Sequence, residues 1–360
     1  MFILKKILYL VNILVAFCLL LTYLPYHLDW FDKISLLSYA YPFALVINVF
    51  FIILWLIISP RRHMLLSAIV IFLHFGFVFR LVNFSRQEDK QQGDITIMTY
   101  NVNYFEHNTQ DTNAKKKGNI DSILAFIHRV NPDIICFQDY FSSTTDKQDV
   151  HYRLNKAMKY GYFYFYVKNE SDKIHDCAIY SKYYIADAGS VLPEYDKNYS
   201  LIYADISVKN KVTRIYNLHL ISYLLGKEEK NSYSRIIHGD ITNKEGGKRI
   251  LKKLVLADNQ KEKQVKEIFS NIGDDDKPYI VVGDFNSTPF SKVYKLMTKD
   301  LEDAFVQKGK GLGRSYNGVF PAYRIDYILY PKETFKAKNY YSPDLDFSDH
   351  YPVVTTLSVD

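Results

Sequence analysis

The chain has 360 residues, of which 48% are hydrophobic, and a formal net charge of +6. The length suits one large domain or two ordinary ones, and the apolar content excludes a chain too polar to build a core. The positive charge is compatible with an anionic partner, although solvated surface lysines produce the same excess.

Three apolar runs occupy the amino-terminal part of the chain, at residues 7–24, 36–58 and 64–79. Crossing a bilayer takes roughly 20 apolar residues, so we expect three transmembrane helices in a membrane domain of residues 1–84. A cleaved signal peptide is the alternative for the first run, but no small-residue cleavage site follows it. The third run ends at Arg80, whose side chain can extend to the membrane surface. A buried helix is the alternative for this run.

Lysine and arginine are distributed unevenly around these runs. Lys5 and Lys6 precede the first run, and Arg61 and Arg62 lie between the second and the third. Because cationic loops stay in the cytoplasm, three spans place everything after residue 85 outside it, whereas two spans would leave that part inside. We therefore expect an integral protein of a bacterial-type inner membrane, with an extracytoplasmic soluble domain.

A polar linker at residues 85–93 precedes a soluble domain at residues 94–360. Within it, short runs have the composition and alternation of strands: 94–100, 133–137, 177–181, 201–208, 212–216, 278–282, 325–330 and 353–357. Apolar residues at helical spacing predict helices around residues 120–127 and 265–272. Strands interspersed with helices predict an α/β domain of two packed sheets flanked by helices.

Two further features of the composition are less specific. Cys18, Cys136 and Cys177 have no zinc-site spacing, and we expect reduced thiols, mostly in the core. The lysine-rich stretch 244–266, with Leu251 and other apolar residues interleaved, predicts a basic amphipathic helix. Its basic side could contact phosphates or anionic headgroups, but acidic residues dilute the charge and favour a solvated face.

Short polar motifs stand at the ends of the strand runs. In chain order they are Thr99-Tyr-Asn101, Phe137-Gln-Asp139, Asn217-Leu-His219, Gly283-Asp-Phe-Asn286, Arg324-Ile-Asp326 and Ser348-Asp-His350. Strand ends place side chains at the rim of a sheet, where residues far apart in sequence converge. Carboxylates, carboxamides and imidazoles gathered there suit a hard divalent cation and a phosphate ester.

The motifs divide the expected chemistry between them. Asp284 is placed to orient or deprotonate a water, and Asn286 to donate to a phosphate oxygen. Asp326 can hold the imidazole of His350 for acid or base work. Asp139 suits a metal ligand, although taken alone it is equally a solvated loop aspartate, and a lone histidine such as His219 is more often structural.

In this order, the motifs resemble the endonuclease/exonuclease/phosphatase superfamily, which includes pancreatic deoxyribonuclease, abasic-site exonucleases, inositol-polyphosphate phosphatases and neutral sphingomyelinases. The resemblance covers residues 94–360 and implies a DNase I-like, four-layer sandwich of two mixed β-sheets between helices. It also implies cleavage of phosphate esters with Mg²⁺, or alternatively Mn²⁺. A membrane-anchored member of the superfamily is therefore expected.

The resemblance also assigns roles to the motif residues. It implies metal ligands at Asn101, Asp139 and Asp349. It implies catalytic roles for five further residues, namely His219, Asp284, Asn286, Asp326 and His350. One departure is Asp139, where the family usually has glutamate; the shorter side chain keeps the charge but must hold the cation differently.

The motifs do not select the substrate. The leading hypothesis is a membrane-anchored nuclease that hydrolyses phosphodiester bonds in nucleic acid. A sphingomyelinase-like or inositol-phosphate phosphodiesterase is the alternative, since attachment to a lipid bilayer favours a phospholipid substrate. An inactive, membrane-bound binding protein is a third hypothesis. It is disfavoured because Asp284, Asn286, Asp349 and His350 are all retained. No obligate protein partner is expected.

Overall fold

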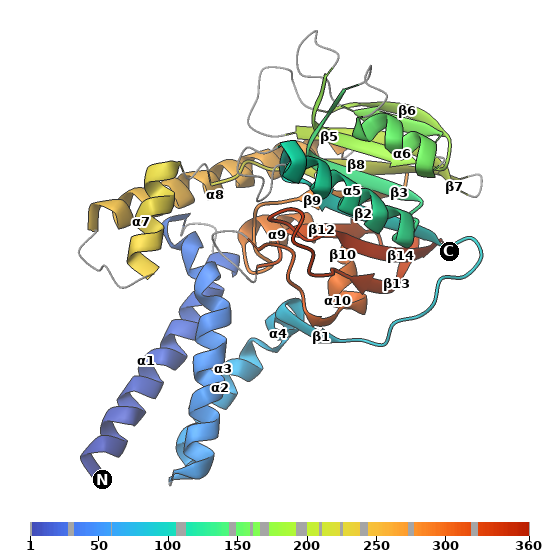
Figure 1. Cartoon of the computed structure of the whole chain (residues 1–360). Helices are drawn as coiled ribbons and strands as arrows, with labels where there is room; N and C mark the ends of the chain where they lie inside the picture. The colour runs from blue at the N-terminus through green and yellow to red at the C-terminus, as the bar shows by residue number, and fades with distance from the viewer. Residues whose placement is uncertain are drawn as a thin grey trace. The chain divides into compact units, whose positions relative to one another are not determined.

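The strand runs after residue 94 pair into two six-stranded sheets in a computed structural model of the chain (Figure 1). The structure describes residues 2–27, 32–58, 60–105, 113–143, 149–158, 161–165, 173–191, 200–208, 211–223, 226–237, 244–272, 277–317 and 323–359. Compactness divides the chain into two units, and each is described by itself below. The first comprises residues 1–82, 223–262 and 287–296, and the second comprises residues 83–222, 263–286 and 297–360.

Both large sheets lie in the second unit. The first sheet has the order β13 (Phe335–Tyr341), β14 (Val353–Val359), β2 (Ile95–Asn101), β3 (Ile134–Ser143), β5 (Lys173–Ser181) and β4 (Tyr162–Phe165). The second has the order β10 (Glu302–Asp303), β12 (Asp326–Tyr330), β9 (Tyr279–Asp284), β8 (Lys211–His219), β7 (Ser200–Val208) and β6 (Ile185–Ser190). In each sheet one pair is parallel, β2 with β3 and β8 with β9, and the other pairs are antiparallel. The predicted class, two mixed sheets flanked by helices, is confirmed.

The remaining elements are short or helical. A small sheet pairs β1 (Val82–Phe84) with β11 (Lys310–Leu312). The helices after residue 94 are η3 (Asn103–Phe105), α5 (Asn113–Val130), α6 (Val150–Met158), α7 (Lys227–Ile237), α8 (Lys244–Ile272), α9 (Lys292–Met297) and α10 (Ala304–Lys308). Both predicted helices are present, within α5 and α8, and the lysine-rich stretch is part of a single helix with the second of them.

Alternating side chains build two separate cores. Ile95 and Ile97 of β2 join the apolar cluster between the sheets, which also contains Ile215 of β8. Met98 and Tyr100 of the same strand join a second cluster with residues of α5 and α6. Because successive strand residues point to opposite faces, one strand serves both layers, as a four-layer sandwich requires. Cys136 and Cys177 are free thiols buried in the core between the sheets, and Cys18 is free and exposed.

A buried polar bridge joins the two sheets. Gln138 of β3 donates from Nε2 to Asn217 Oδ1 of β8 at 2.6 Å. Asn217 Nδ2 donates to the backbone oxygens of Phe137 at 2.8 Å and Ala178 at 3.1 Å. Gln138 and Asn217 are fully buried, so each hydrogen bond avoids the cost of an unpaired buried amide. The bridge therefore fixes how β8 lies across β3 and β5.

The predicted linker contains neither helix nor strand, yet it is fastened to the second unit. Glu88 accepts hydrogen bonds from Lys308 at 2.5 Å and from Lys338 at 3.1 Å. These two bonds lower the pKa of Glu88 to about 2. Lys90 pairs with Asp133 at 2.5 Å. The segment thus follows a defined path along the second unit.

The first unit contains the amino-terminal helices α1 (Phe2–His27), η1 (Asp32–Ala40), α2 (Tyr41–Ile57), η2 (Arg61–His63), α3 (Met64–Leu73) and α4 (Phe75–Leu81). Residues 2–24 and 36–57 are each long and apolar enough to cross a membrane. The helices at 61–73 and 75–81 are bent by 71° at the break between them, and count as a third span only if the bent pair is one span. The structure therefore supports two candidate spans, and a third with a sharp bend.

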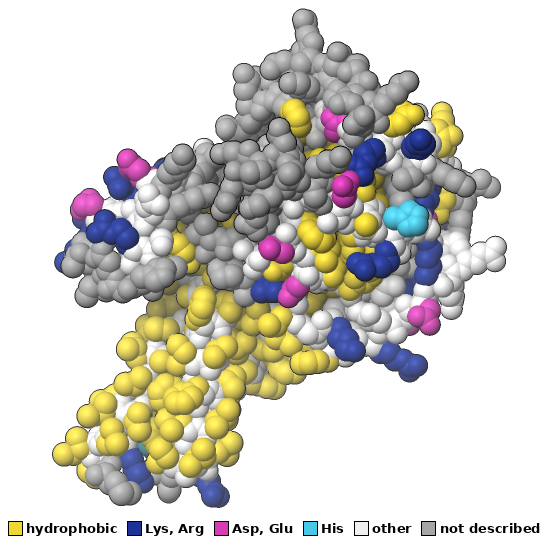
Figure 2. Space-filling view, viewed as in Figure 1, with side chains coloured by type: hydrophobic (Ala, Val, Ile, Leu, Met, Phe, Trp, Pro, Cys, Tyr) yellow, Lys and Arg dark blue, Asp and Glu magenta, His cyan; other side chains and the backbone are white. Residues whose placement is uncertain are grey.

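Polarity in these helices is inverted relative to a water-soluble bundle. Large hydrophobic side chains cover their outside (Figure 2), including Phe43 and Phe72. Polar groups lie inside beside apolar ones: Asn12 Nδ2 donates to Ser67 Oγ at 2.7 Å, and Trp55 Nε1 donates to Asn12 Oδ1 at 2.8 Å. These bonds tie α1, α2 and α3 together. Apolar surfaces outside and polar contacts between helices are typical of membrane proteins.

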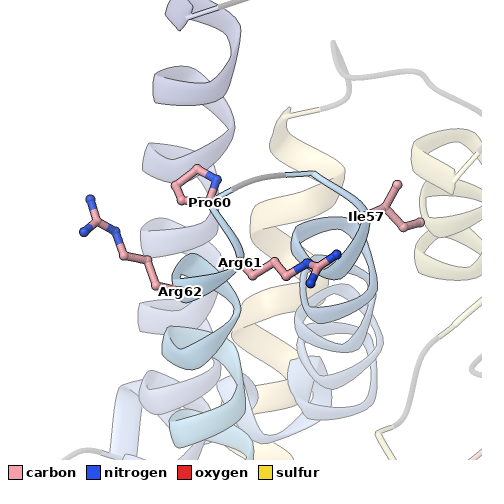
Figure 3. A pocket seen from close by; sticks show the side chains of 4 residues that line it. All are labelled: Ile57, Pro60, Arg61 and Arg62. Carbon is pink, nitrogen blue, oxygen red and sulfur yellow. The ribbon is translucent and has the colours of Figure 1, made fainter.

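The turn between α2 and α3 carries a shallow pocket lined by Ile57, Pro60, Arg61 and Arg62 (Figure 3). The pocket contains no residue of the strand-end motifs. Arg61 and Arg62 are exposed, in keeping with a cationic loop at a membrane surface.

Arg80 contacts protein groups at the end of α4. Its guanidinium donates to the backbone oxygen of Pro289 at 3.2 Å and to the hydroxyl of Tyr26 at 2.9 Å. It also lies over the rings of Phe77 and Tyr294, at 4.4 and 5.2 Å from their centres. Arg80 thus joins α1 and α4 to residues 287–296, which directly follow Asn286 in the chain.

Gly283 has a backbone requirement that we predict to be strict. Its φ is +136°, and an added Cβ would lie 1.9 Å from the backbone oxygen of Leu218 on the paired strand. We expect Gly283→Ala to lower the free energy of unfolding by about 3 kcal/mol or more, because the clash is with backbone. Thermal unfolding of the full chain in detergent measures this loss.

Gly161→Ala is the matched control, since a Cβ there meets nothing within 4 Å. Equal unfolding temperatures for both variants would contradict the assigned strand register.

Candidate active site

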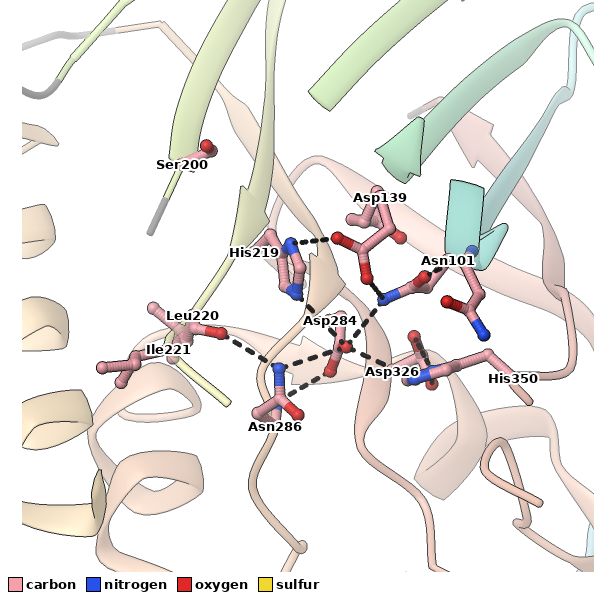
Figure 4. Close-up of polar contacts among 12 residues, drawn as sticks. Asn101, Asp139, Ser200, His219, Leu220, Ile221, Asp284, Asn286, Asp326 and His350 are labelled. Carbon is pink, nitrogen blue, oxygen red and sulfur yellow. Dashed lines mark hydrogen bonds and ion pairs between the residues drawn. The ribbon is translucent and has the colours of Figure 1, made fainter. Parts of the chain in front are cut away.

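The strand-end motifs meet at one rim of the two sheets. Asn101 is the last residue of β2, His219 ends β8 and Asp284 ends β9. Asp139 lies in β3 at an irregularity in its pairing with β5. Because β2 and β3 are parallel, as are β8 and β9, the three strand ends and the irregularity within β3 present these four side chains on the same side (Figure 4).

Two antiparallel strands complete the rim from the opposite direction. Asp326, the first residue of β12, is paired with Asp284. His350 lies shortly before β14, whose Val353 pairs with Thr99 of β2. A β-bridge between His350 and Tyr316 holds this segment, and the two rings contact edge to face at 4.9 Å.

Asp284 lies at the centre of the site and is 1% exposed. Its carboxylate accepts hydrogen bonds from the backbone N–H of Asn286 at 2.7 Å and from Nδ2 of Asn101 at 3.2 Å. Asn286 Nδ2 donates both to Asp284 at 3.2 Å and to the backbone oxygen of Leu220 at 3.0 Å. Both amide hydrogens of Asn286 are therefore engaged, and a bond to phosphate would replace the longer of the two.

Two histidines flank Asp284 in matching arrangements. His219 Nε2 is 3.8 Å from an Asp284 oxygen, and His350 Nε2 is 3.7 Å from the same oxygen. The Nδ1 atoms are held by other carboxylates, His219 by Asp176 at 2.9 Å and His350 by Asp326 at 3.0 Å. A carboxylate only accepts hydrogen bonds, so each Nδ1 carries a proton and each Nε2 faces Asp284.

The charges around these groups shift their titration. Burial raises the pKa of Asp284 to about 6, with a further contribution from the charge of Asp326, although His350 and His219 oppose the shift. Burial lowers the pKa of His350, but the charges of Asp326 and Asp284 outweigh burial and raise it to about 10. In the same way, the charges of Asp139 and Asp176 outweigh burial and raise the pKa of His219 well above its ordinary value. Protonated imidazoles thus face a carboxyl group that titrates near neutrality.

Asp176 was not among the residues that the motifs indicated. It lies in β5 opposite Tyr140, and its second oxygen accepts a hydrogen bond from Ser200 Oγ. In sequence it directly precedes the predicted strand 177–181, which the structure extends backward to Lys173. Its position beside a predicted strand was the one sequence signal that could have indicated Asp176. Its pairing with His219 could not be predicted, because His219 is far away in the chain.

Left-handed backbone recurs at this rim. Asp139, Asp176 and Asn286 have φ values of 46°, 78° and 47°. Aspartate and asparagine tolerate this conformation better than longer side chains, so the local backbone favours Asp139 over glutamate.

The oxygen-rich side of the site suits a hard cation. Asp139, Asp176 and His219 form one group of potential ligands, and Asp284, Asp326 and His350 form another. Asn101 Nδ2 donates to Asp139 at 3.2 Å, and its Oδ1 accepts from the backbone of Asn103. Four buried or half-buried carboxylates outnumber the two imidazoles even when both are protonated. The residues present therefore fit a divalent cation, which would offset this excess of negative charge.

Asp349 is placed differently from the other predicted residues. It is half-buried, its side chain lies 3.5 Å from the hydroxyl of Ser348, and its backbone oxygen accepts from Asn317 at 2.8 Å. Neither group of potential ligands contains it. Its charge nevertheless contributes to the raised pKa of His350, so it lies near the site.

Comparison with known proteins identifies the family. A sequence profile of the endonuclease/exonuclease/phosphatase family matches residues 98–350. A second profile, described as a domain of unknown function (DUF8431), matches residues 5–81. No curated protein matches the chain. The chain belongs to the endonuclease/exonuclease/phosphatase family, whose members are phosphoester hydrolases that typically use divalent metal ions.

Solved structures show the same fold. An endonuclease/exonuclease/phosphatase family protein from Leptotrichia buccalis is similar with a TM-score of 0.50 and 15% identity, over 74% of this chain and 99% of that one. The human Nocturnin catalytic domain with bound sulfate is similar with a TM-score of 0.50 and 17% identity, over 76% and 96%. D. rerio TDP2 complexed with a single-strand DNA product is similar with a TM-score of 0.51 and 15% identity, over 74% and 100%.

The raised pKa of His350 gives a pH-dependent stability. The protonated form is favoured in the folded chain, so its stabilising effect is complete below the unfolded pKa of 6.5 and is lost as pH rises through about 10. We expect wild type to unfold at a higher temperature than His350→Gln near pH 6, by a margin that shrinks toward about pH 10. Thermal unfolding in chelator, so that no cation intervenes, measures the margin.

His128→Gln, at an exposed position of α5, is the control. A margin for His350→Gln that stays constant or grows with pH would contradict the assigned charge.

Proposed function

We propose that this chain is a membrane-anchored, magnesium-dependent phosphodiesterase, and most simply a nuclease. The observation that carries the proposal is the arrangement of Asp284 between two imidazoles, each held at Nδ1 by its own carboxylate. The distances from Asp284 to His219 and His350 are 3.8 and 3.7 Å. This arrangement supplies a base and two cationic donors within one small site.

The residues divide the reaction as follows. Asp284, with its pKa raised to about 6, orients the attacking water and accepts its proton. The imidazoles of His350 and His219 present N–H groups to the phosphate oxygens, where negative charge accumulates in the transition state. Asp326 and Asp176 hold those imidazoles in position, and Asn286 holds Asp284 or donates to the phosphate.

Asn101, Asp139 and Asp349 are the proposed metal residues, with Asp176 available beside Asp139. Mg²⁺ prefers oxygen ligands and needs only one or two carboxylates from the protein; Mn²⁺ accepts the same set. When bound, the cation supplies charge neutralisation at the phosphate. The aspartate at position 139 suits the left-handed backbone there.

Nucleic acid is the substrate we favour. The fold likeness to TDP2, a structure with a single-strand DNA product, supports the proposal, as does the net charge of +6. A phospholipid or inositol-phosphate substrate is the second candidate, supported by the two apolar helices that could hold the domain at a bilayer.

Activity of the full chain tests the proposal. We expect cleavage of plasmid DNA in Mg²⁺ and none in chelator. Asp284→Asn and His350→Gln should each reduce the rate at least about 10³-fold, because each removes a group that acts in the transition state. Gel assays on DNA and RNA, and product analysis on sphingomyelin in mixed micelles, measure these rates.

Asp300→Asn, an exposed aspartate away from the site, should retain full activity. Turnover of sphingomyelin alone would favour the second candidate. Failure to cleave any of the three substrates would instead support an inactive binding protein.

We also propose that the second unit is extracytoplasmic, which requires three spans. In a Cys18→Ser background, an impermeant maleimide added to intact spheroplasts should label Asp300→Cys and leave Arg62→Cys unlabelled, because the bilayer separates the two positions. Absence of label at both positions would mean two spans and a cytoplasmic catalytic domain, and label at Arg62→Cys alone would mean three spans in the opposite orientation. Labelling after lysis is the control that both introduced cysteines can react. Cys136 and Cys177 are buried, so we expect little background labelling from them.

A further inference from the structure

One face of helix α8 is cationic, exposed and unused by the proposed reaction. Between residues 244 and 262, exposed positions recur at helical spacing, at Lys244, Lys248, Leu251, Lys252 and Leu256. Arg249 and Glu245 are also exposed. Lys248 pairs with Glu245 at 3.1 Å and Arg249 with Glu228 of α7 at 3.6 Å, so four cationic residues stand against two acidic residues here. The opposite face, with Ile250 and Ala257, is buried. The helix is thus amphipathic, with an apolar face buried in the protein and a cationic face exposed.

Two leucines lie within the cationic face. Leu251 is 55% exposed and Leu256 is 52% exposed. A face that binds only the phosphates of nucleic acid needs no exposed leucine, whereas a helix at a bilayer surface inserts such side chains between headgroups. The composition therefore favours lipid over nucleic acid as the partner.

The same helix contacts the start of a candidate membrane span. Tyr39, within the span of residues 36–57, donates from its hydroxyl to Asp258 of α8 at 3.3 Å. Its ring also lies edge to face with Tyr223, 5.9 Å between centres. Tyrosine is enriched where membrane helices meet water, so this contact places α8 beside that boundary.

A buried lysine fixes this junction. Lys261 is fully buried, with its Nζ 3.6 Å from Asp258 and 3.6 Å from the centre of the Tyr223 ring. A buried lysine is costly unless it is paired, and here the carboxylate and the ring face supply the pairing. The helix is therefore held in place beside the span.

From this geometry we infer that α8 lies on the membrane surface and binds anionic phospholipid headgroups through the face of Lys244, Lys248 and Lys252, with Leu251 and Leu256 inserted. The inference rests on the proposed membrane anchoring and does not depend on the proposed hydrolysis. In this inference, α8 attaches the first unit to a membrane leaflet that contains anionic lipid.

The test uses the full chain in lipid nanodiscs, with Cys18→Ser and a polarity-sensitive fluorophore on Leu256→Cys. Discs of phosphatidylcholine alone are compared with discs that also contain phosphatidylglycerol. We expect a blue shift of the emission, and stronger quenching by brominated acyl chains, in the anionic discs. High salt should reduce both effects.

Charge reversal at Lys244, Lys248 and Lys252 to Glu should abolish the difference between the two kinds of disc. The same reversal at Lys310, Lys332 and Lys336, exposed residues of the second unit, should leave it unchanged. A single-stranded oligonucleotide, added in chelator to neutral discs, should not change the emission.

Three results would overturn the inference. One is an emission that ignores disc charge in a chain that has entered the discs. The second is a response to the oligonucleotide in place of anionic lipid. The third is a chain that does not enter discs at all, which would remove the membrane anchoring as well. None of these measurements depends on catalysis, so a chain that does not hydrolyse phosphodiesters would give the same outcome.

Discussion

The site depends on how two sheets are held face to face, and the buried bridge between Gln138 and Asn217 sets that relation. The bridge lies one residue before Asp139 on β3 and two residues before His219 on β8. Its hydrogen bonds, at 2.6 to 3.1 Å, join two fully buried amides, so a slide of one sheet would leave buried amides unpaired. The apolar cluster between the sheets gives adhesion without direction, whereas the amides give register. The side chains of the candidate site take their spacing from this register.

The same register concentrates charge. Asp139, Asp176, Asp284 and Asp326 come from four strands, and none is isolated from the others. Burial, with a further contribution from the charge of Asp326, raises the pKa of Asp284 to about 6. The neighbouring carboxylates stabilise the protonated forms of the two histidines, which offset part of the negative charge. A bound cation would reduce the repulsion between carboxylates held this closely, which agrees with the metal use typical of the family.

The first unit follows the opposite rule of polarity. Asn12 and Ser67 bond to each other inside the helices, while Phe43 and Phe72 face outward. A large exposed apolar surface of this kind marks a site of interaction with a membrane or with another protein. Arg80 extends this unit to residues 287–296 through the carbonyl of Pro289. Asp284 and Asn286 belong to the second unit, and the next residue in the chain, Ser287, belongs to the first.

The sequence by itself determined which polar residues follow the strand runs, where the apolar runs lie and the class of fold. Alternation, helical spacing and polar residues at strand ends are local signals. A single motif such as the one that ends in Asp139 was ambiguous, and the order of the six motifs along the chain gave them their specificity. Only the tertiary structure decided which side chains pair. Asp176 holds His219 from 43 positions away, and the path of residues 85–93 is fixed by Lys308 and Lys338. Such pairings follow strand order and register, which arise from long-range contacts that no local pattern encodes.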